Sequence, residues 1–400
     1  MIQGEPMTTN ERPYKILALD GGGFRGVMTA QILAKIEAEI SAKYDGCKLH
    51  EYFDLVTGTS TGSLLAAGIA LGMSAKELLD LYEENGDRIF PSGMRFRRRF
   101  TGLLSNLGLY NNKTGLGKVL EEKFGDVAMG ALPDEAPVLL IPSYDLTARR
   151  TNWFCSNNPK TDPVWYDSVP IWKICTCSSA APTFFPPFEL PYKDGTERPF
   201  IDGGVSVNNP ALIGIAHALF LPYRDAVDNP PDYTLNDLAV LSIGTGESIE
   251  PFSYKQVRRW GALKWVQRLP DLFLPAPNEV NAAICWQIIR QESDENAKRV
   301  LRLDYALPSR EQYMDNEGYS KLKEVESVHQ AFLKKQFGAI DNPDLFKAYK
   351  DFAQCYLDGE LLSRDLARTT LRDSVPPNEA IAEFIENNQY PTNKYPHKCD

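Results

Sequence analysis

Short runs of apolar residues alternate along this chain with longer segments in which apolar residues recur at helical spacing. The runs predict buried strands, and they lie at Tyr14–Asp20, Tyr52–Gly58, Pro137–Asp145 and Leu238–Gly246. Between the first two runs, the apolar positions follow helical spacing from residue 27 to about residue 44. Strands that alternate with helices predict an α/β fold, with a mainly parallel central sheet and helices on both faces.

Local signals refine this outline. Residues 61–72 are apolar nearly all round, which predicts a buried helix. Ser74 and Glu77 form a capping-box pattern that opens a further helix. A hairpin is expected around the Asp194–Gly195 turn, because this dipeptide favours a tight connection between two strands.

The pattern predicts one large α/β domain over residues 14–330. A flexible N-terminus, residues 1–13, precedes it, and a helical, charged C-terminal extension, residues 331–400, is packed on the domain or appended to it. The 400 residues are enough for one large domain of this class or for two smaller ones.

Charge and cysteine content narrow the class of protein. The net charge of −10 argues against a general nucleic-acid binder, which needs a basic face. The seven cysteines include no C-x-x-C pair, which favours a reduced, intracellular setting and gives no metal-ligand pattern. No secretory signal and no apolar run of membrane-spanning length is visible, so we expect a cytoplasmic protein that can contact a membrane surface.

The first glycine-rich turn, Gly21–Gly26, fits G-x-G-x-x-G, follows a strand and opens a helix. One interpretation is a dinucleotide site, which also needs an acidic residue about 20 residues further on, at the end of the next strand. Glu37 and Glu39 come too early for that role, and Asp54 comes late. A second interpretation is an oxyanion hole, because successive glycines leave backbone N–H groups open at a helix N-terminus. A third is a tight turn that serves packing.

The second turn, Gly58-Thr59-Ser60-Thr61-Gly62, has the G-x-S-x-G form of a nucleophile elbow. A strand precedes Ser60 and a helix of small residues follows it, which is the setting that an elbow requires. Gly58 and Gly62 relieve crowding where the chain turns. Ser60 is therefore a candidate nucleophile, with an inert turn serine as the alternative.

The third turn, Asp202-Gly203-Gly204, also stands between a strand-like segment and a helix. Because strand–helix turns gather at the carboxyl edge of an open α/β sheet, all three turns can meet there. Taken alone, Asp202 is better explained as a turn residue that bonds its own backbone.

The base that would activate Ser60 is not an obvious histidine. His217 lies about 10 Å along a predicted helix, away from the carboxyl edge, and His50 precedes the second strand at its other end. His329 and His397 lie in late, polar segments. Asp202 remains as the base; its ordinary pKa is about 3.9, so it can act only if it is hydrogen-bonded directly to the hydroxyl.

The motifs DGGGFRG, GTSTG and DGG, in this order, resemble those of the patatin-like phospholipases. The segments SSAAPTFFPP (residues 178–187), IPSYDL and LSIGTG also resemble parts of that family, and the resemblance covers roughly residues 14–322. It implies a patatin-like three-layer α/β/α fold.

The resemblance also implies roles for residues. Ser60 would be the nucleophile and Asp202 the base of a Ser–Asp dyad, and the amides of Gly22 and Gly23 would form the oxyanion hole, with Arg25 nearby as positive support. Ser63 stands where the family commonly has glycine after GTSTG, a mild departure. The remaining motif glycines are Gly21, Gly26, Gly58, Gly62, Gly203 and Gly204.

The implied activity is that of a serine esterase: a lipid acyl hydrolase of the phospholipase A type that releases free fatty acids from membrane lipids without a metal or other cofactor. Two other classes stay open. One is a nucleotide-binding oxidoreductase that uses Gly21–Gly26. The other is a catalytically silent storage or scaffold protein with the same fold.

Two stretches are candidates for contact with a membrane. Arg95–Phe100 interleaves arginines with phenylalanines, which suits an anionic lipid surface and equally suits a solvated loop paired with the protein's own carboxylates. Trp260–Phe273 is rich in aromatic residues, which would form an acyl pocket, an interfacial patch or part of the core. Peripheral membrane contact through these stretches is a hypothesis.

Overall fold

The structure is a computed structural model of the chain. It describes residues 12–90, 115–158, 164–182, 184–220, 233–248, 252–261, 264–265, 275–290, 296–334, 336–360 and 375–389. Arg95–Phe100 and most of Trp260–Phe273 lie outside the described residues, as do His397 and almost all of the N-terminal segment.

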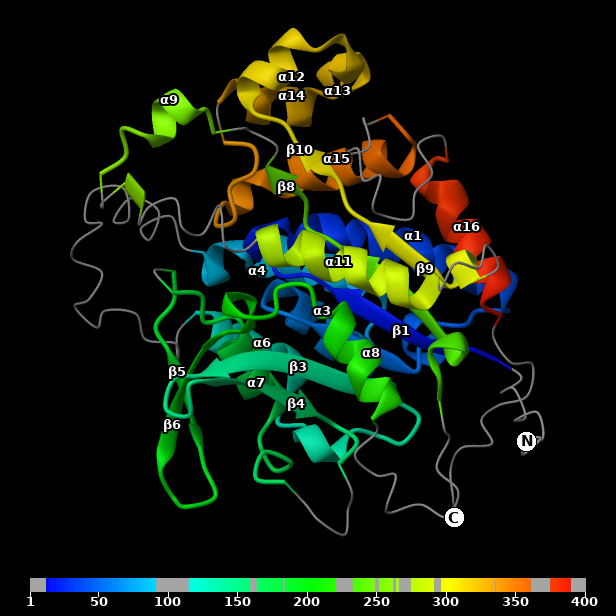
Figure 1. Cartoon of the computed structure of the whole chain (residues 1–400), viewed down its shortest axis with the longest axis vertical. Helices are drawn as coiled ribbons and strands as arrows, with labels where there is room; N and C mark the ends of the chain where they lie inside the picture. Colours follow the sequence, from blue (N-terminus) through cyan, green and yellow to red (C-terminus); the bar gives the residue numbers. More distant parts are fainter. Residues whose placement is uncertain are drawn as a thin grey trace, which may run out of the picture.

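The centre of the fold is a sheet with the strand order β5-β6-β3-β2-β1-β7-β9, in which β4 also pairs with β3 (Figure 1). Strands β3, β2, β1, β7 and β9 run parallel, and β4, β5 and β6 join antiparallel at the β3 side. The strands are β1 (Tyr14–Leu19), β2 (Leu55–Gly58), β3 (Val138–Asp145), β4 (Arg150–Cys155), β5 (Phe188–Pro191), β6 (Glu197–Asp202), β7 (Leu238–Ile243) and β9 (Val300–Leu303). A separate pair consists of β8 (Glu247–Ser248) and β10 (Ala306–Leu307).

Helices cover both faces of this sheet (Figure 1). The longer helices are α1 (Gly26–Lys43), α3 (Thr61–Ala70), α4 (Ala75–Ile89), α6 (Leu116–Phe124), α7 (Ile171–Ser178), α8 (Ala211–Leu219), α11 (Pro275–Arg290), α14 (Glu326–Leu333), α15 (Phe346–Leu357) and α16 (Pro377–Asn387). The shorter ones are α2 (Leu49–Tyr52), α9 (Tyr254–Val257), α12 (Arg310–Asp315) and α13 (Ser320–Glu324).

The alternation of side chains along β1 separates two cores. Leu17 and Leu19 point into the larger core, which contains α1, α3, α4 and α7, whereas Ile16 and Ala18 point into the smaller core under α8 and α11. The expected fold class is confirmed: helices pack on both faces of a central, mainly parallel sheet.

The local predictions are largely confirmed. Helix α3 is buried on all sides, and Ser74 caps α4 in a capping box with Glu77. The hairpin around Asp194–Gly195 is the β5–β6 pair. One boundary differs: Tyr52 belongs to α2, and β2 begins only at Leu55, because a helical turn starts just before the strand, where the Glu51 carboxylate accepts the N–H of Lys48 at 2.8 Å.

The third turn reaches the sheet edge by a different route from the first two. Its strand, β6, is antiparallel to β3, and it overlaps β3 only through its last residues, with Asp202 opposite Ser143. Since β3 is parallel to β2, Ser143 lies near the carboxyl end of the parallel strands. Asp202 therefore arrives at the same edge as Ser60, although it does not follow a parallel strand.

The described part of the C-terminal extension packs on the domain. Both α15 and α16 lie against α1 and contribute to the larger core, through Phe352 and Phe384 among others. The segment before α15 also reaches the first glycine turn, where the N–H of Phe24 donates to the carbonyl of Ile340 at 2.8 Å. A domain boundary at residue 330 stays a prediction. Within the described ranges, none of the helices combines the length and the apolar character needed to cross a membrane.

Candidate active site

Ser60 stands on a strained turn between β2 and α3. Its φ is 52° and its ψ is −123°, a conformation that non-glycine residues rarely adopt and that costs about 1–3 kcal/mol. The flanking glycines are required by close approach of the backbone. A Cβ on Gly58 would lie 2.0 Å from the carbonyl oxygen of Gly62, and one on Gly62 would lie 2.1 Å from that of Leu19. This is the geometry of the elbow that the sequence predicts.

Asp202 ends β6 and is almost fully buried. Its Oδ1 accepts a hydrogen bond from the Gly204 N–H at 2.7 Å. Burial raises the pKa of Asp202 to about 6, against the opposing effect of hydrogen bonds from the Gly204 amide and from the Ser60 side chain. The structure thus brings the hydroxyl of Ser60 and the carboxylate of Asp202 together.

The histidines that the structure describes have other neighbours. His217 is buried, with Nε2 at 3.0 Å from Asn157 Oδ1 and 3.3 Å from Cys155 Sγ. Burial lowers the pKa of His217 to about 4, so it is a neutral, buried histidine. His50 lies in α2, before β2, and His329 bonds to a tyrosine hydroxyl.

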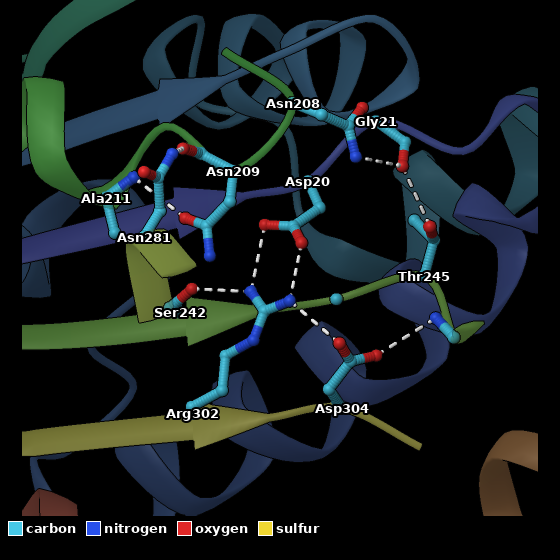
Figure 2. Close-up of polar contacts among 12 residues, drawn as sticks. Asp20, Gly21, Asn208, Asn209, Ala211, Ser242, Thr245, Asn281, Arg302 and Asp304 are labelled. Carbon is cyan, nitrogen blue, oxygen red and sulfur yellow. Dashed lines mark hydrogen bonds and ion pairs between the residues drawn. The ribbon is translucent and has the colours of Figure 1, made fainter. Parts of the chain in front are cut away.

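The first glycine turn presents open amides. Within the described residues, no acceptor takes the N–H of Gly22 or of Gly23. Gly23 has a φ of 60°, and a Cβ on Gly22 would lie 2.1 Å from Thr245 Oγ1. The carbonyl of Gly21 is held by Thr245 Oγ1 at 2.8 Å and by Asn208 Nδ2 at 3.4 Å (Figure 2). The turn is therefore fixed on both sides of these two amides, while the N–H groups of Gly22 and Gly23 have no acceptor among the described residues.

Arg25 holds the end of this turn. Its Nη1 donates to the carbonyl of Gly246 at 2.9 Å, and its Nε donates to the carbonyl of Gly22 at 3.4 Å. The guanidinium is thus engaged with backbone carbonyls of the turn and of the loop after β7. Its role as positive support for an oxyanion stays a prediction.

Arg302 was not singled out from the sequence, yet it anchors the start of the turn. It comes from β9 and binds both carboxylate oxygens of Asp20, and it also binds Ser242 Oγ at 2.7 Å and Asp304 Oδ2 at 2.8 Å (Figure 2). Burial raises the pKa of Asp20 to about 7, although Arg302 opposes the shift. The available signal was an arginine inside an apolar strand, because a buried charge needs a partner.

These parts suit one kind of chemistry. A serine on a strained turn, a buried carboxylate beside its hydroxyl and unpaired amides on a neighbouring turn are the groups that acyl transfer through a covalent intermediate uses. No group of three or more potential metal ligands occurs in the described part of the chain. The class of protein that this fold and site fit is a hydrolase of acyl esters.

Comparison with known proteins gives the family. The model of the patatin-like phospholipases matches residues 17–215. A cGAMP-activated phospholipase of Vibrio cholerae is 32% identical over 343 residues, covering 81% of this chain and 91% of the relative. Patatin-17 of Solanum cardiophyllum is 29% identical over 379 residues, covering 88% and 92%. The chain belongs to the patatin-like phospholipase family, and lipid acyl hydrolysis is the general activity that this membership supports.

Among solved structures, VipD of Legionella pneumophila is similar, with a TM-score of 0.36 and 12% identity, over 86% of this chain and 68% of that one.

Proposed function

We propose that the protein is a lipid acyl hydrolase of the phospholipase A type that cleaves acyl esters of membrane lipids through an acyl-enzyme on Ser60. Asp202 is the base, and the amides of Gly22 and Gly23 form the oxyanion hole. The observation that carries the proposal is the proximity of the Ser60 side chain to the buried Asp202 carboxylate, whose pKa it lowers by hydrogen bonding. The glycine turn with the open amides of Gly22 and Gly23 lies close by, since a Cβ on Gly21 would be 3.2 Å from the Cβ of Ser60.

The reaction proceeds in two halves. Asp202 takes the proton of the Ser60 hydroxyl as its oxygen attacks the ester carbonyl, and the negative charge moves to the carbonyl oxygen. The intermediate collapses when the lipid alcohol leaves with the proton from Asp202, and the acyl group stays on Ser60 as an ester. A water molecule then gives its proton to Asp202 and attacks the acyl-enzyme, and the fatty acid leaves as the proton returns to Ser60.

The electrostatics of the site support this assignment. A base works best when its pKa lies near the operating pH, and burial raises the pKa of Asp202 to about 6, well above the ordinary value of about 3.9. One well-placed amide contributes on the order of 3 kcal/mol to stabilising an oxyanion. The glycine turn therefore supplies stabilisation that a histidine-free dyad needs.

A lipid-class hydrolysis panel tests the proposal. Phospholipids, lysophospholipids, monoacylglycerols and a short acyl ester are offered to the wild type, Ser60→Ala and Asp202→Asn, and released fatty acid is measured. We expect fatty acid from at least one membrane lipid with the wild type and almost none with either variant. Undiminished release by Ser60→Ala would overturn the proposal.

We further propose that a cyclic dinucleotide stimulates this activity. The support is the 32% identity, over 81% of the chain, to a phospholipase whose name states activation by cGAMP. Fatty-acid release is measured with and without cGAMP at a saturating lipid concentration. A several-fold rise is expected, and an unchanged rate would count against this regulation.

We also propose that the protein works from the cytoplasm as a peripheral membrane enzyme. In the described part of Trp260–Phe273, the rings of Trp260 and Trp265 meet edge to face with their centroids 5.1 Å apart, and Trp265 is 40% exposed, which favours a surface patch over the core. Flotation of Ser60→Ala with anionic vesicles tests the contact. Loss of flotation in Trp260→Ala/Trp265→Ala is expected, and flotation equal to that of the parent would argue against the patch.

A further inference from the structure

Ser178, the last residue of α7, is bonded to the backbone of the elbow. Its hydroxyl is fully buried, accepts a hydrogen bond from the Ser60 N–H at 3.0 Å and donates one to the carbonyl of Pro142 in β3 at 2.8 Å. A single side chain therefore joins the end of α7 to the turn that carries the hydroxyl of Ser60 and to the strand beside it.

The same short segment is bonded to the backbone of Asp202. The carbonyl of Ala180 accepts the Asp202 N–H at 3.1 Å. Gly203 approaches Pro142 so closely that a Cβ on it would lie 2.3 Å from the Pro142 carbonyl oxygen. Ser178 and Ala180 thus hold the Ser60 turn on one side and the Asp202 turn on the other, although the two turns are far apart in the sequence.

We propose that Ser178 is a positioning residue that sets the distance between the Ser60 hydroxyl and the Asp202 carboxylate. The inference rests on the proposed roles of Ser60 and Asp202. The end of α7 would thus fix the nucleophile relative to the base. A dyad without an imidazole needs this, because its two side chains must contact each other directly.

The physical reason lies in the backbone of the elbow. Ser60 occupies the N-cap position of α3, where its N–H has no partner within the helix. A buried N–H without a partner is unfavourable, so the bond to Ser178 stabilises the left-handed conformation of Ser60 in which the amide meets that hydroxyl. Because this amide is occupied, it is not available to an oxyanion.

The neighbouring serine supplies a matched control. Ser179 is also buried, and within the described residues its hydroxyl has no hydrogen-bond partner. Ser178→Ala and Ser179→Ala remove the same atom from adjacent buried positions. Ser178→Thr and Ser178→Val form a second pair, because their side chains have nearly the same shape and only the first keeps a hydroxyl.

The experiment measures kcat, KM and the pH profile of hydrolysis for these variants, together with their unfolding curves. A small displacement of reacting groups costs on the order of 10²-fold in rate, so Ser178→Ala should lose about that factor in kcat at a similar KM, while Ser179→Ala behaves as the wild type. The acid limb of the pH profile should also move to higher pH in Ser178→Ala. Hydrogen bonding from Ser60 lowers the pKa of Asp202, so a displaced Ser60 should let that pKa rise. Ser178→Thr should retain more kcat than Ser178→Val.

Equal kcat in Ser178→Ala and Ser179→Ala would overturn the inference. If Ser178→Ala does not fold, equal kcat in the Thr and Val variants would overturn it instead. Both outcomes are read with the wild type active and Ser60→Ala inactive, so they leave the proposed function standing. Activity that persists in Ser60→Ala would overturn the proposed function itself.

Discussion

Asp20 and Arg302 form a two-pronged ion pair between the end of β1 and β9. Nη1 of the arginine lies 2.9 Å from Oδ1 of the aspartate, and Nη2 lies 2.5 Å from Oδ2 (Figure 2). Asp304 extends the contact, because it binds Arg302 and accepts the N–H of Gly246 at 3.1 Å. Since the carbonyl of Gly246 accepts Arg25, one buried cluster holds both ends of the first glycine turn.

Replacing Arg302 should therefore cost much of the stability. Arg302→Met leaves the buried carboxylates of Asp20 and Asp304 without their cation, and breaking a buried pair costs about 3–5 kcal/mol. Denaturant unfolding measures the loss. Lys35→Met is the control, because Lys35 pairs with Glu39 on a partly exposed surface of α1, where such pairs contribute about 0–1 kcal/mol. Similar losses in the two variants would contradict this view of the cluster.

A side chain at Gly23 should impair the reaction because it displaces the turn. A glycine with similar backbone strain but no close neighbour, Gly125, separates this steric effect from the effect of strain. Gly23 and Gly125 have φ values of 60° and 63°, so an alanine at either position costs about 1–3 kcal/mol of backbone strain. Only at Gly23 does the new Cβ collide, at 2.3 Å from the carbonyl oxygen of Ile340, whereas Gly125 has open space.

We expect Gly23→Ala to lose on the order of 10²-fold or more in kcat, because the amides aimed at the oxyanion are displaced. Gly125→Ala should lose stability only. Steady-state kinetics and unfolding curves on both proteins check this prediction. A kcat for Gly23→Ala close to that of Gly125→Ala would show that the turn is not part of the reaction.

The pH dependence of kcat/KM should report Asp202. The base must be ionised to accept the proton of Ser60, and burial raises its pKa to about 6. Activity should therefore rise as pH increases through about 6 and should be lost as pH falls below it. A profile that stays flat from pH 5 to pH 7 on a substrate with rate-limiting acylation would argue against this base.

Asp202→Asn should remove the base and yet stabilise the fold. The pKa of Asp202 is about 6 in the folded state against an ordinary value of about 3.9, so the folded protein binds the proton more tightly and loses stability as pH rises from about 4 to 6. At pH 7 the neutral amide avoids that cost, on the order of 3 kcal/mol.

Thermal unfolding at pH 7 and at pH 4 measures the difference. The variant should be more stable than the wild type at pH 7, and the gain should shrink towards pH 4. Its kcat should fall on the order of 10²- to 10⁴-fold, the usual contribution of a general base. A variant that is less stable at pH 7 would mean that the carboxylate is not held at an energetic cost.

The sequence predicts those parts of the site that are formed by short motifs of neighbouring residues. The elbow around Ser60 follows from glycines two positions on either side of a serine between a strand and a helix, and the open turn follows from consecutive glycines. Ser178 and Arg302 carry no such local signal, because the atoms that they bind belong to Ser60 and Asp20, more than a hundred residues away.

Contacts between distant segments also explain where the observed fold goes beyond the sequence prediction. The hairpin of β5 and β6 was predicted from its turn, but the direction in which β6 meets β3 depends on pairing between distant strands. The hydrogen bonds that Arg25 gives to Gly22 and Gly246 likewise depend on a loop that arrives after β7.

The most direct test of the central claim is the rate at which a fluorophosphonate forms an adduct on Ser60, followed by mass spectrometry of the modified peptide. The account predicts a single adduct on Ser60 in the wild type, no adduct in Ser60→Ala, a rate reduced on the order of 10²-fold or more in Asp202→Asn, and most of the wild-type rate in His217→Ala. Modification of Ser60 at the wild-type rate in Asp202→Asn, or its loss in a correctly folded His217→Ala, would contradict a nucleophile that is activated by this carboxylate alone.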